Sequence, residues 1–148
     1  MPRVDVETET CDYVLFQVGS LTCGLNIDRV QEIEDNLEIT RVHRAPHWVR
    51  GVINLRGQLL TIIDLRSKLG MPAADMSTTK RVVVVKGDEG LMGLLVDAID
   101  DVVEADLADV EPPPSHIGQV PGIFFDAIYK MPNGLAALLD LPQVLAPD

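Results

Sequence analysis

Four aspartates follow apolar runs, and carboxylates placed in pairs can carry general acid–base catalysis. These residues are Asp28, Asp64, Asp97 and Asp140. Because each one ends an apolar, strand-like segment, the simpler interpretation is that its carboxylate caps the following turn by accepting backbone N–H groups. The alternative is a small acidic β-barrel enzyme or ligand-binding protein, which requires a polar pocket where the four carboxylates converge.

Two histidines have the four-residue spacing of a helical metal-binding pair. Pro46 lies between His43 and His47, and proline disrupts the helical geometry that such a pair needs. No third ligand is apparent in the sequence beside them. The cysteines Cys11 and Cys23 form no Cys-x-x-Cys arrangement, so the sequence predicts neither a metal site nor a disulfide framework.

The spacing Gly87-x-x-Gly90-x-x-Gly93 is similar to that of a nucleotide-binding turn. It leads into a further apolar strand at residues 94–96, whereas a phosphate site needs a helix N-terminus there. The chain has no Gly-x-Ser-x-Gly motif, no phosphate-loop lysine and no cysteine with a suitably placed histidine. The sequence therefore predicts a protein that is not an enzyme and binds no cofactor.

Charge is unevenly distributed along the chain. The 148 residues include 12 lysines and arginines against 23 aspartates and glutamates, a formal charge of -11. Residues 1–86 hold 11 bases and 11 acids, whereas residues 87–148 hold 12 acids and the single base Lys130. This acidic balance disfavours nonspecific nucleic-acid binding, which depends on neutralising phosphates.

A basic window lies within this acidic chain. No acid occurs between Glu38 and Asp64, a segment that also contains His43 and His47. Its arginines are Arg41, Arg44, Arg50 and Arg56. Four arginines without neighbouring acids favour contact with a carboxylate-bearing partner protein. An ordinary solvated surface is the other interpretation.

The location of the protein is predicted from its apolar runs. None approaches the roughly 20 residues of a membrane-spanning helix. Residues 1–12 mix charged side chains and lack the apolar stretch of a secretion signal. We expect a cytoplasmic protein without direct membrane insertion.

Short strands separated by turn residues account for most of the chain, which predicts an all-β fold with short helical turns. Strands are expected over residues 13–18, 21–27, 49–55, 59–63, 81–86, 91–96, 124–131 and 135–140. We also expect a helical turn at 30–33 capped by Asp28, a short helix at 65–69 and an aperiodic loop at 71–79. The 47% of hydrophobic residues are sufficient for a single globular domain spanning residues 1–148.

An internal repeat organises these elements. Residues 24–33 match residues 93–102, and residues 57–69 match residues 134–145 around their Asp-Leu pairs. Two matches in the same order indicate a duplication with halves at about 13–70 and 80–145. Each copy contains about five strands, which can close a small barrel, and we expect the two barrels to share a core at their seam.

The segment from Val49 to Arg66, which reads VRGVINLRGQLLTIIDLR, closely resembles the signature of the CheW-like family of bacterial chemotaxis coupling proteins. The segment DRVQEI at residues 28–33 resembles the same family, and the likeness extends from residue 13 to residue 141. Thr61 departs from the family pattern, which usually has proline there. The resemblance implies two intertwined five-stranded β-barrels.

The resemblance also implies an adaptor that bridges the regulatory domain of the histidine kinase CheA and the cytoplasmic hairpin tips of chemoreceptors, and that is located at membrane-associated receptor arrays. The receptor-binding positions of the family correspond to Val30, Glu32, Gly51 and Arg56. Core packing for Val30 and an internal salt bridge for Arg56 are the competing interpretations.

An aromatic pair is a candidate kinase-binding patch. Phe124 and Phe125 are adjacent in an expected strand, so alternation requires that at least one of them points inward. Within the family, the sequence leaves open a CheW-like adaptor of a non-flagellar pathway, such as type IV pilus or gliding control.

Overall fold

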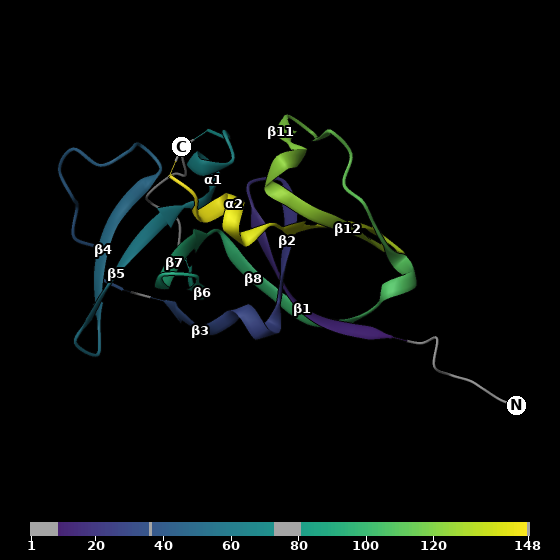
Figure 1. The fold of residues 1–148 in the computed structure, drawn as a ribbon, viewed down its shortest axis with the longest axis horizontal. Helices are drawn as coiled ribbons and strands as arrows, with labels where there is room; N and C mark the ends of the chain where they lie inside the picture. Colours follow the sequence, from purple (N-terminus) through teal and green to yellow (C-terminus); the bar gives the residue numbers. More distant parts are fainter. Residues whose placement is uncertain (1–8, 36, 73–80, 148) are drawn as a thin grey trace, which may run out of the picture.

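The structure is a computed structural model that describes residues 9–35, 37–72 and 81–147. Strands dominate these residues, which confirms the predicted all-β class. Figure 1 shows the two main sheets toward opposite ends of the molecule, with helix α2 between them. None of the helices in the described ranges is long and apolar enough to span a membrane.

The first sheet has six strands in the order β8-β1-β2-β13-β12-β9. Its strands are β1 (Thr10–Val18), β2 (Leu21–Asn26), β8 (Ala98–Asp106), β9 (Val110–Glu111), β12 (Phe125–Met131) and β13 (Gly134–Leu139). All neighbouring pairs are antiparallel except β2 and β13, which run parallel. A separate small hairpin consists of β10 (His116–Ile117) and β11 (Val120–Pro121).

The second sheet has five strands in the order β3-β6-β7-β5-β4. Its strands are β3 (Val30–Asp35), β4 (Val49–Leu55), β5 (Gln58–Asp64), β6 (Arg81–Gly87) and β7 (Gly90–Val96). The helical elements are α1 (Leu65–Lys68), α2 (Leu141–Leu145) and the 3-10 turns η2 (Ile27–Arg29), η3 (Leu107–Asp109) and η4 (Gly122–Phe124). Here the parallel pair is β5 and β7, the counterpart of β13 and β2.

Each sheet is built from both repeats. Strands β1 and β2 of the first repeat join β8, β9, β12 and β13 of the second, while β6 and β7 join β3, β4 and β5. The chain changes sheets at η2 and again between β7 and β8. The sequence-derived halves at about 13–70 and 80–145 therefore do not correspond to the two sheets, because each copy gives its first two strands to the other copy's sheet.

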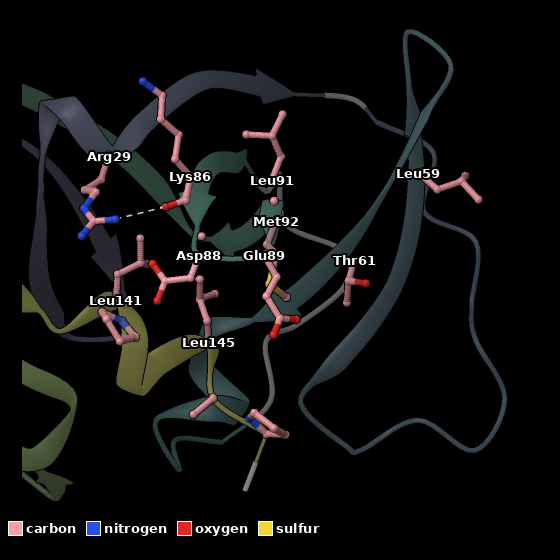
Figure 2. Close-up of a pocket in the computed structure, with 15 residues that line it drawn as sticks. Arg29, Leu59, Thr61, Lys86, Asp88, Glu89, Leu91, Met92, Leu141 and Leu145 are labelled. Carbon is pink, nitrogen blue, oxygen red and sulfur yellow. Dashed lines mark hydrogen bonds between the residues drawn. The ribbon is translucent and has the colours of Figure 1, made fainter.

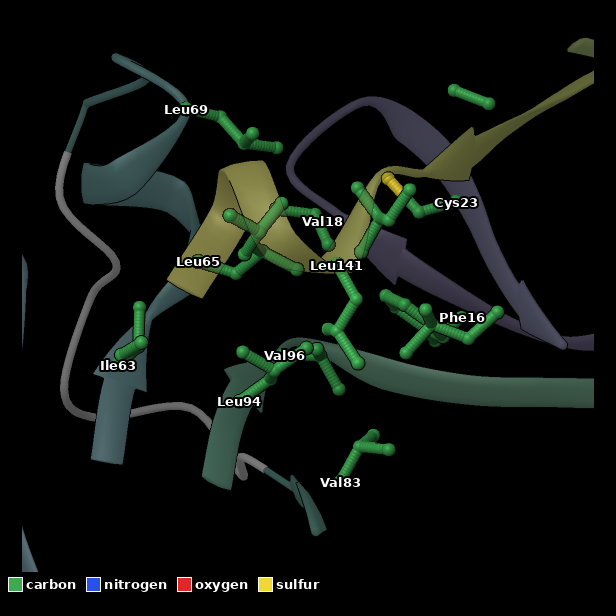
Figure 3. Close-up of a cluster of buried hydrophobic side chains, with 14 of the residues drawn as sticks. Phe16, Val18, Cys23, Ile63, Leu65, Leu69, Val83, Leu94, Val96 and Leu141 are labelled. Atoms are coloured by element: carbon green, nitrogen blue, oxygen red, sulfur yellow. The ribbon is translucent and has the colours of Figure 1, made fainter. Parts of the chain in front are cut away.

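The buried valines of β6 serve two separate cores. Val83 and Val85 belong to a large cluster between the sheets, whereas Val82 and Val84 face a second cluster inside the five-stranded sheet. Alternate residues of a strand point to opposite faces, so a continuous apolar run is expected where both faces are covered. Figure 3 shows the shared cluster, in which Leu141 of α2 lies among side chains from both sheets. This is the core at the seam that the duplication predicted.

Two contacts draw the edges of the five-stranded sheet together. Strands β3 and β4 are its edges, and no ladder joins them within the described ranges. The connection after β3 instead reaches β4 through Thr40 and Val52, whose backbone N–H and C=O groups exchange two hydrogen bonds of 2.8 Å. Arg56, in the β4–β5 turn, pairs with Glu32 of β3. The sheet is therefore curled as in a barrel, with an incomplete ladder of strand pairing.

Two local predictions were wrong. The helical turn expected at 30–33 is strand β3, which pairs with β6, and the helical residues are Ile27–Arg29. Asn26, rather than Asp28, is the N-cap, since its side-chain oxygen accepts a hydrogen bond of 2.8 Å from the Asp28 N–H. Most of the loop expected at 71–79 lies outside the described residues.

Candidate interaction surface

The β4–β5 turn presents Arg56 toward the opposite edge of its sheet. Arg56 has a φ of 52° and Gly57 a φ of 87°, the left-handed pair typical of a tight two-residue hairpin turn. The Asn54 side chain accepts a hydrogen bond of 2.8 Å from the Gly57 N–H, which fixes the turn. The positive φ predicted for Gly57 is confirmed. The Arg56 side chain remains 66% exposed although it pairs with Glu32, so it is open to a partner.

The acids of β3 are electrostatically linked. A hydrogen bond with Glu34 and the contact with Arg56 lower the pKa of Glu32. The same hydrogen bond with Glu32 raises the pKa of Glu34. Arg56 thus favours the charged form of Glu32, whereas the hydrogen bond with Glu32 makes Glu34 harder to ionise, and this edge combines an exposed cation with two half-buried acids.

The other two positions predicted for receptor binding are less accessible. Val30 is half-buried and packs against the core between the sheets. Gly51 is buried, and a Cβ atom there would lie 2.2 Å from the backbone oxygen of Thr40. Its φ of 153° also disfavours any side chain. The β3–β4 connection passes so close to residue 51 that only glycine fits there, so no partner contact is needed to explain this residue type.

The basic window does not form one uniform surface. Arg41 and Arg44 are exposed, but Arg50 points inward to an ion pair with Asp64, which is only 2% exposed. Leu59 lies on β5 opposite Asn54 and is 69% exposed. Sequence reasoning missed Leu59 as a surface residue, although strand alternation next to the buried Leu60 predicts that it faces outward.

The aromatic pair does not form an exposed patch. Phe125 is 4% exposed within the core between the sheets, and Phe124 is half-buried against the same core. Phe124 ends η4 and Phe125 begins β12, so the two are not consecutive residues of one strand as expected. Ile123, 61% exposed, is the apolar side chain that η4 presents to solvent.

The four aspartates have separate structural partners. Asp64 pairs with Arg50, and Asp97 accepts hydrogen bonds from the Gly19 N–H at 2.6 Å and from Arg66 Nε at 2.9 Å. Asp140 caps α2 by accepting a bond of 3.2 Å from the Gln143 N–H, as predicted. Asp28 is exposed within η2. No contact in the described ranges gathers the four carboxylates, and those ranges hold no cluster of three or more acids, histidines or cysteines suited to a metal.

One further acid lies beside Asp140. Partial burial raises the pKa of the largely exposed Asp126, the negative charge of Asp140 and a hydrogen bond with Asp140 raise it further, and Arg29 partly opposes the shift. Sequence reasoning missed this pair, because Asp126 and Asp140 belong to different strand ends that only the β12–β13 hairpin brings together.

Comparison with known proteins places these features in a family context. The sequence profile described as the CheW-like domain matches residues 12–147. The chemotaxis protein CheW of Rhizobium meliloti is 32% identical over 133 residues, covering 90% of this chain and 86% of that protein. The protein PilI of Pseudomonas aeruginosa is 32% identical over 99 residues, covering 67% of this chain and 56% of PilI.

A solved structure has the same architecture. The scaffolding protein TtCheW of Thermoanaerobacter tengcongensis superimposes with a TM-score of 0.87 at 26% sequence identity, and the match covers 95% of both chains. The exchange of strands between the repeats and the core shared by the two sheets therefore belong to a fold known from a scaffold protein.

Proposed function

This chain belongs to the CheW-like domain family, and from that premise we propose that it is the non-enzymatic adaptor that couples chemoreceptor tips to the histidine kinase CheA. Its place in the cell is then the cytoplasmic face of membrane-associated receptor arrays. The family is one of chemotaxis scaffold proteins rather than enzymes. An adaptor needs surfaces for two partners on one rigid body, and the shared core between the sheets provides such a body.

The contact between Arg56 and Glu32 is the observation that carries the proposed receptor surface. It joins an exposed cation to its paired acid, and the exposed Leu59 follows the same turn on β5. A helical hairpin has apolar side chains that can pack on Leu59 and charged side chains that can pair with Arg56 at the rim. Val30 contributes through its exposed part, and Gly51 supports the β3–β4 connection.

The kinase surface is proposed at η4, at the other sheet. Phe124 offers the exposed part of its ring beside Ile123, while the buried Phe125 holds η4 against the core. Exposed apolar residues anchored on a rigid core are typical of protein interfaces. Two surfaces on different sheets would let both partners bind at once.

A pilus pathway is the second candidate function. The likeness to PilI supports it at the same percentage identity as the likeness to the Rhizobium protein, although over a shorter segment. The same surfaces would then bind the receptor and kinase of that pathway.

Titration calorimetry with purified full-length kinases and with receptors in lipid nanodiscs tests the proposal. We expect the wild-type chain to bind the kinase and the receptor of one pathway. Preference for the flagellar or the pilus pair decides between the two candidates. Binding to neither the kinase nor the receptor of either pathway would contradict the adaptor function.

A further inference from the structure

A hollow of about 510 Å³ lies between the β6–β7 turn, strand β5 and the C-terminal helix α2. Its floor is apolar and includes Leu91, Met92 and Leu145. Figure 2 shows Asp88 and Glu89 of the turn projecting into it. Both acids are exposed, and no ion pair engages either of them within the described ranges.

The first repeat has a corresponding site, in which side chains occupy the space. In the matching place of the first repeat, the β1–β2 turn is Gly19-Ser20, and Met71 packs over Gly19. Asp97 accepts a hydrogen bond from the Gly19 N–H and forms an ion pair with the Arg66 guanidinium at 2.8 Å. A turn, a carboxylate and an arginine from the following helix thus close the space.

The second repeat has the turn but lacks the cation. The matching helix position, two residues after the strand-ending aspartate, holds Pro142 instead of Arg66. The matching carboxylate, Asp28, is exposed and has no ion pair among the described residues. The turn itself has become Asp88-Glu89. Compared with the first site, the second has two acids in its turn and lacks the guanidinium that pairs with the neighbouring carboxylate.

Two cations also line the hollow. They are Arg29 and Lys86, and Arg29 Nη1 donates a hydrogen bond of 3.4 Å to the Lys86 carbonyl oxygen. The charge of Arg29 also acts on Asp126, which does not line the hollow. Asp88 and Glu89 remain available to a cation from outside.

We propose that this hollow receives an arginine or lysine side chain, together with an adjacent apolar residue, from a helix of the receptor tip. The long aliphatic stem of such a side chain packs on Leu91 and Leu145 while its charge lies against Asp88 and Glu89. Leu59 of the proposed receptor surface also lines the hollow, so the two are continuous. This inference rests on the proposed adaptor function.

Charge reversal in the turn tests the inference. The double variant Asp88→Lys/Glu89→Lys changes two exposed residues, so its unfolding temperature should match that of the wild type. Its affinity for the receptor in nanodiscs should fall about tenfold or more, whereas its affinity for full-length kinase should not change. The matched control Asp101→Lys/Asp109→Lys makes the same charge change at exposed acids elsewhere and should bind both partners as the wild type does.

A second variant introduces the missing cation into this chain itself. Pro142→Arg places an arginine where Arg66 stands in the other repeat, and it should weaken receptor binding without lowering thermal stability. Wild-type receptor affinity in both the double variant and Pro142→Arg would overturn the inference while leaving the adaptor function intact. Loss of kinase affinity instead of receptor affinity would overturn the assignment to the receptor. Failure of the wild type to bind the receptor at all would overturn both proposals.

Discussion

Arg56 and Glu32 lie at opposite edges of one sheet, yet their side chains form an ion pair. Glu32 lies on edge strand β3, and Arg56 follows β4 at the other edge. The contact therefore depends on the curl of the whole sheet and not on neighbouring strands. It couples the shape of the five-stranded sheet to the orientation of the arginine that we propose as the main receptor contact.

The first prediction concerns this pair. Arg56→Glu should weaken receptor binding about tenfold, because it places like charges at the rim and reverses the charge offered to an acidic partner. The unfolding transition should change little, since the Arg56 side chain is largely exposed. The exchanged variant Arg56→Glu/Glu32→Arg restores the internal pair. Recovery of receptor binding in the exchanged variant would show that the pair acts structurally and that Arg56 is no direct contact.

The second prediction compares two glycines of the same hairpin. Gly51→Ala should strongly destabilise the protein, because the new Cβ would meet the Thr40 backbone oxygen at 2.2 Å. The Cβ added by Gly57→Ala would meet no atom within 4 Å, so this variant should lose only the free energy of the backbone strain, about 1 to 2 kcal/mol. Denaturant unfolding measures both costs. Full stability of Gly51→Ala together with lost receptor binding would instead identify Gly51 as a contact residue.

The third prediction uses the repeat as its own control. Asp97→Asn should destabilise the protein by about 1 to 3 kcal/mol, because the Asp97 carboxylate accepts a hydrogen bond from the Gly19 N–H and forms an ion pair with the Arg66 guanidinium. Asp28→Asn, at the matching position of the other repeat, should change the unfolding free energy very little, since Asp28 is exposed. Equal costs for the two variants would remove the asymmetry on which the proposed hollow depends.

The fourth prediction is a dependence on pH. Because the pKa of Asp126 is raised in the folded state, this residue contributes stability below its unfolded pKa of about 4, and that contribution is lost as the pH rises through the folded pKa. Asp126→Asn should therefore raise the unfolding temperature at pH 7, and the gain should shrink toward pH 4. Asp109→Asn, at an exposed acid, controls for the general loss of negative charge. An equal gain at both pH values would contradict the prediction.

The fifth prediction concerns the two thiols. Cys23 is fully buried, and burial raises the pKa of its thiol to about 12, so it should resist labelling in the native state. Cys11 is half-buried and should react, although the Asn26 side chain donates a hydrogen bond of 3.0 Å to its sulfur. Mass spectrometry after timed alkylation should find one label in the native protein and two in denaturant. Equal labelling rates in the native protein would contradict the buried position of Cys23.

Local pattern predicted the strands whose side chains are apolar, and it missed β8. That strand carries Asp100, Asp101 and Glu104, which conceal its alternation, and it is recognisable as a strand from its pairing with β1. The turn expected at 30–33 was wrong for a related reason. Val30 and Ile33 have helical spacing, but β6 offers a complete edge of backbone hydrogen bonds, and tertiary pairing outweighs so short a local preference.

The candidate site was predictable only in part. The turn formed by Arg56 and Gly57 follows from its residue types, whereas the partner of Arg56 follows from the curl of the sheet. The burial of Phe125 depends on where η4 ends and β12 begins, which adjacent aromatic residues do not determine. The exchange of strands between the repeats is likewise a long-range feature. Both copies contain enough strands to close separately, and only the pairings of β2 with β13 and of β5 with β7 show that they do not.

We expect one molecule of this chain to bind receptor and kinase at the same time. Sedimentation of receptor-bearing nanodiscs with full-length kinase, in the presence and absence of the chain, measures this joint binding. We predict that the kinase sediments with the receptor only when the chain is present, and that Arg56→Glu abolishes this joint sedimentation while the kinase still binds the variant. Competition between receptor and kinase for the chain, so that each displaces the other, would contradict simultaneous binding.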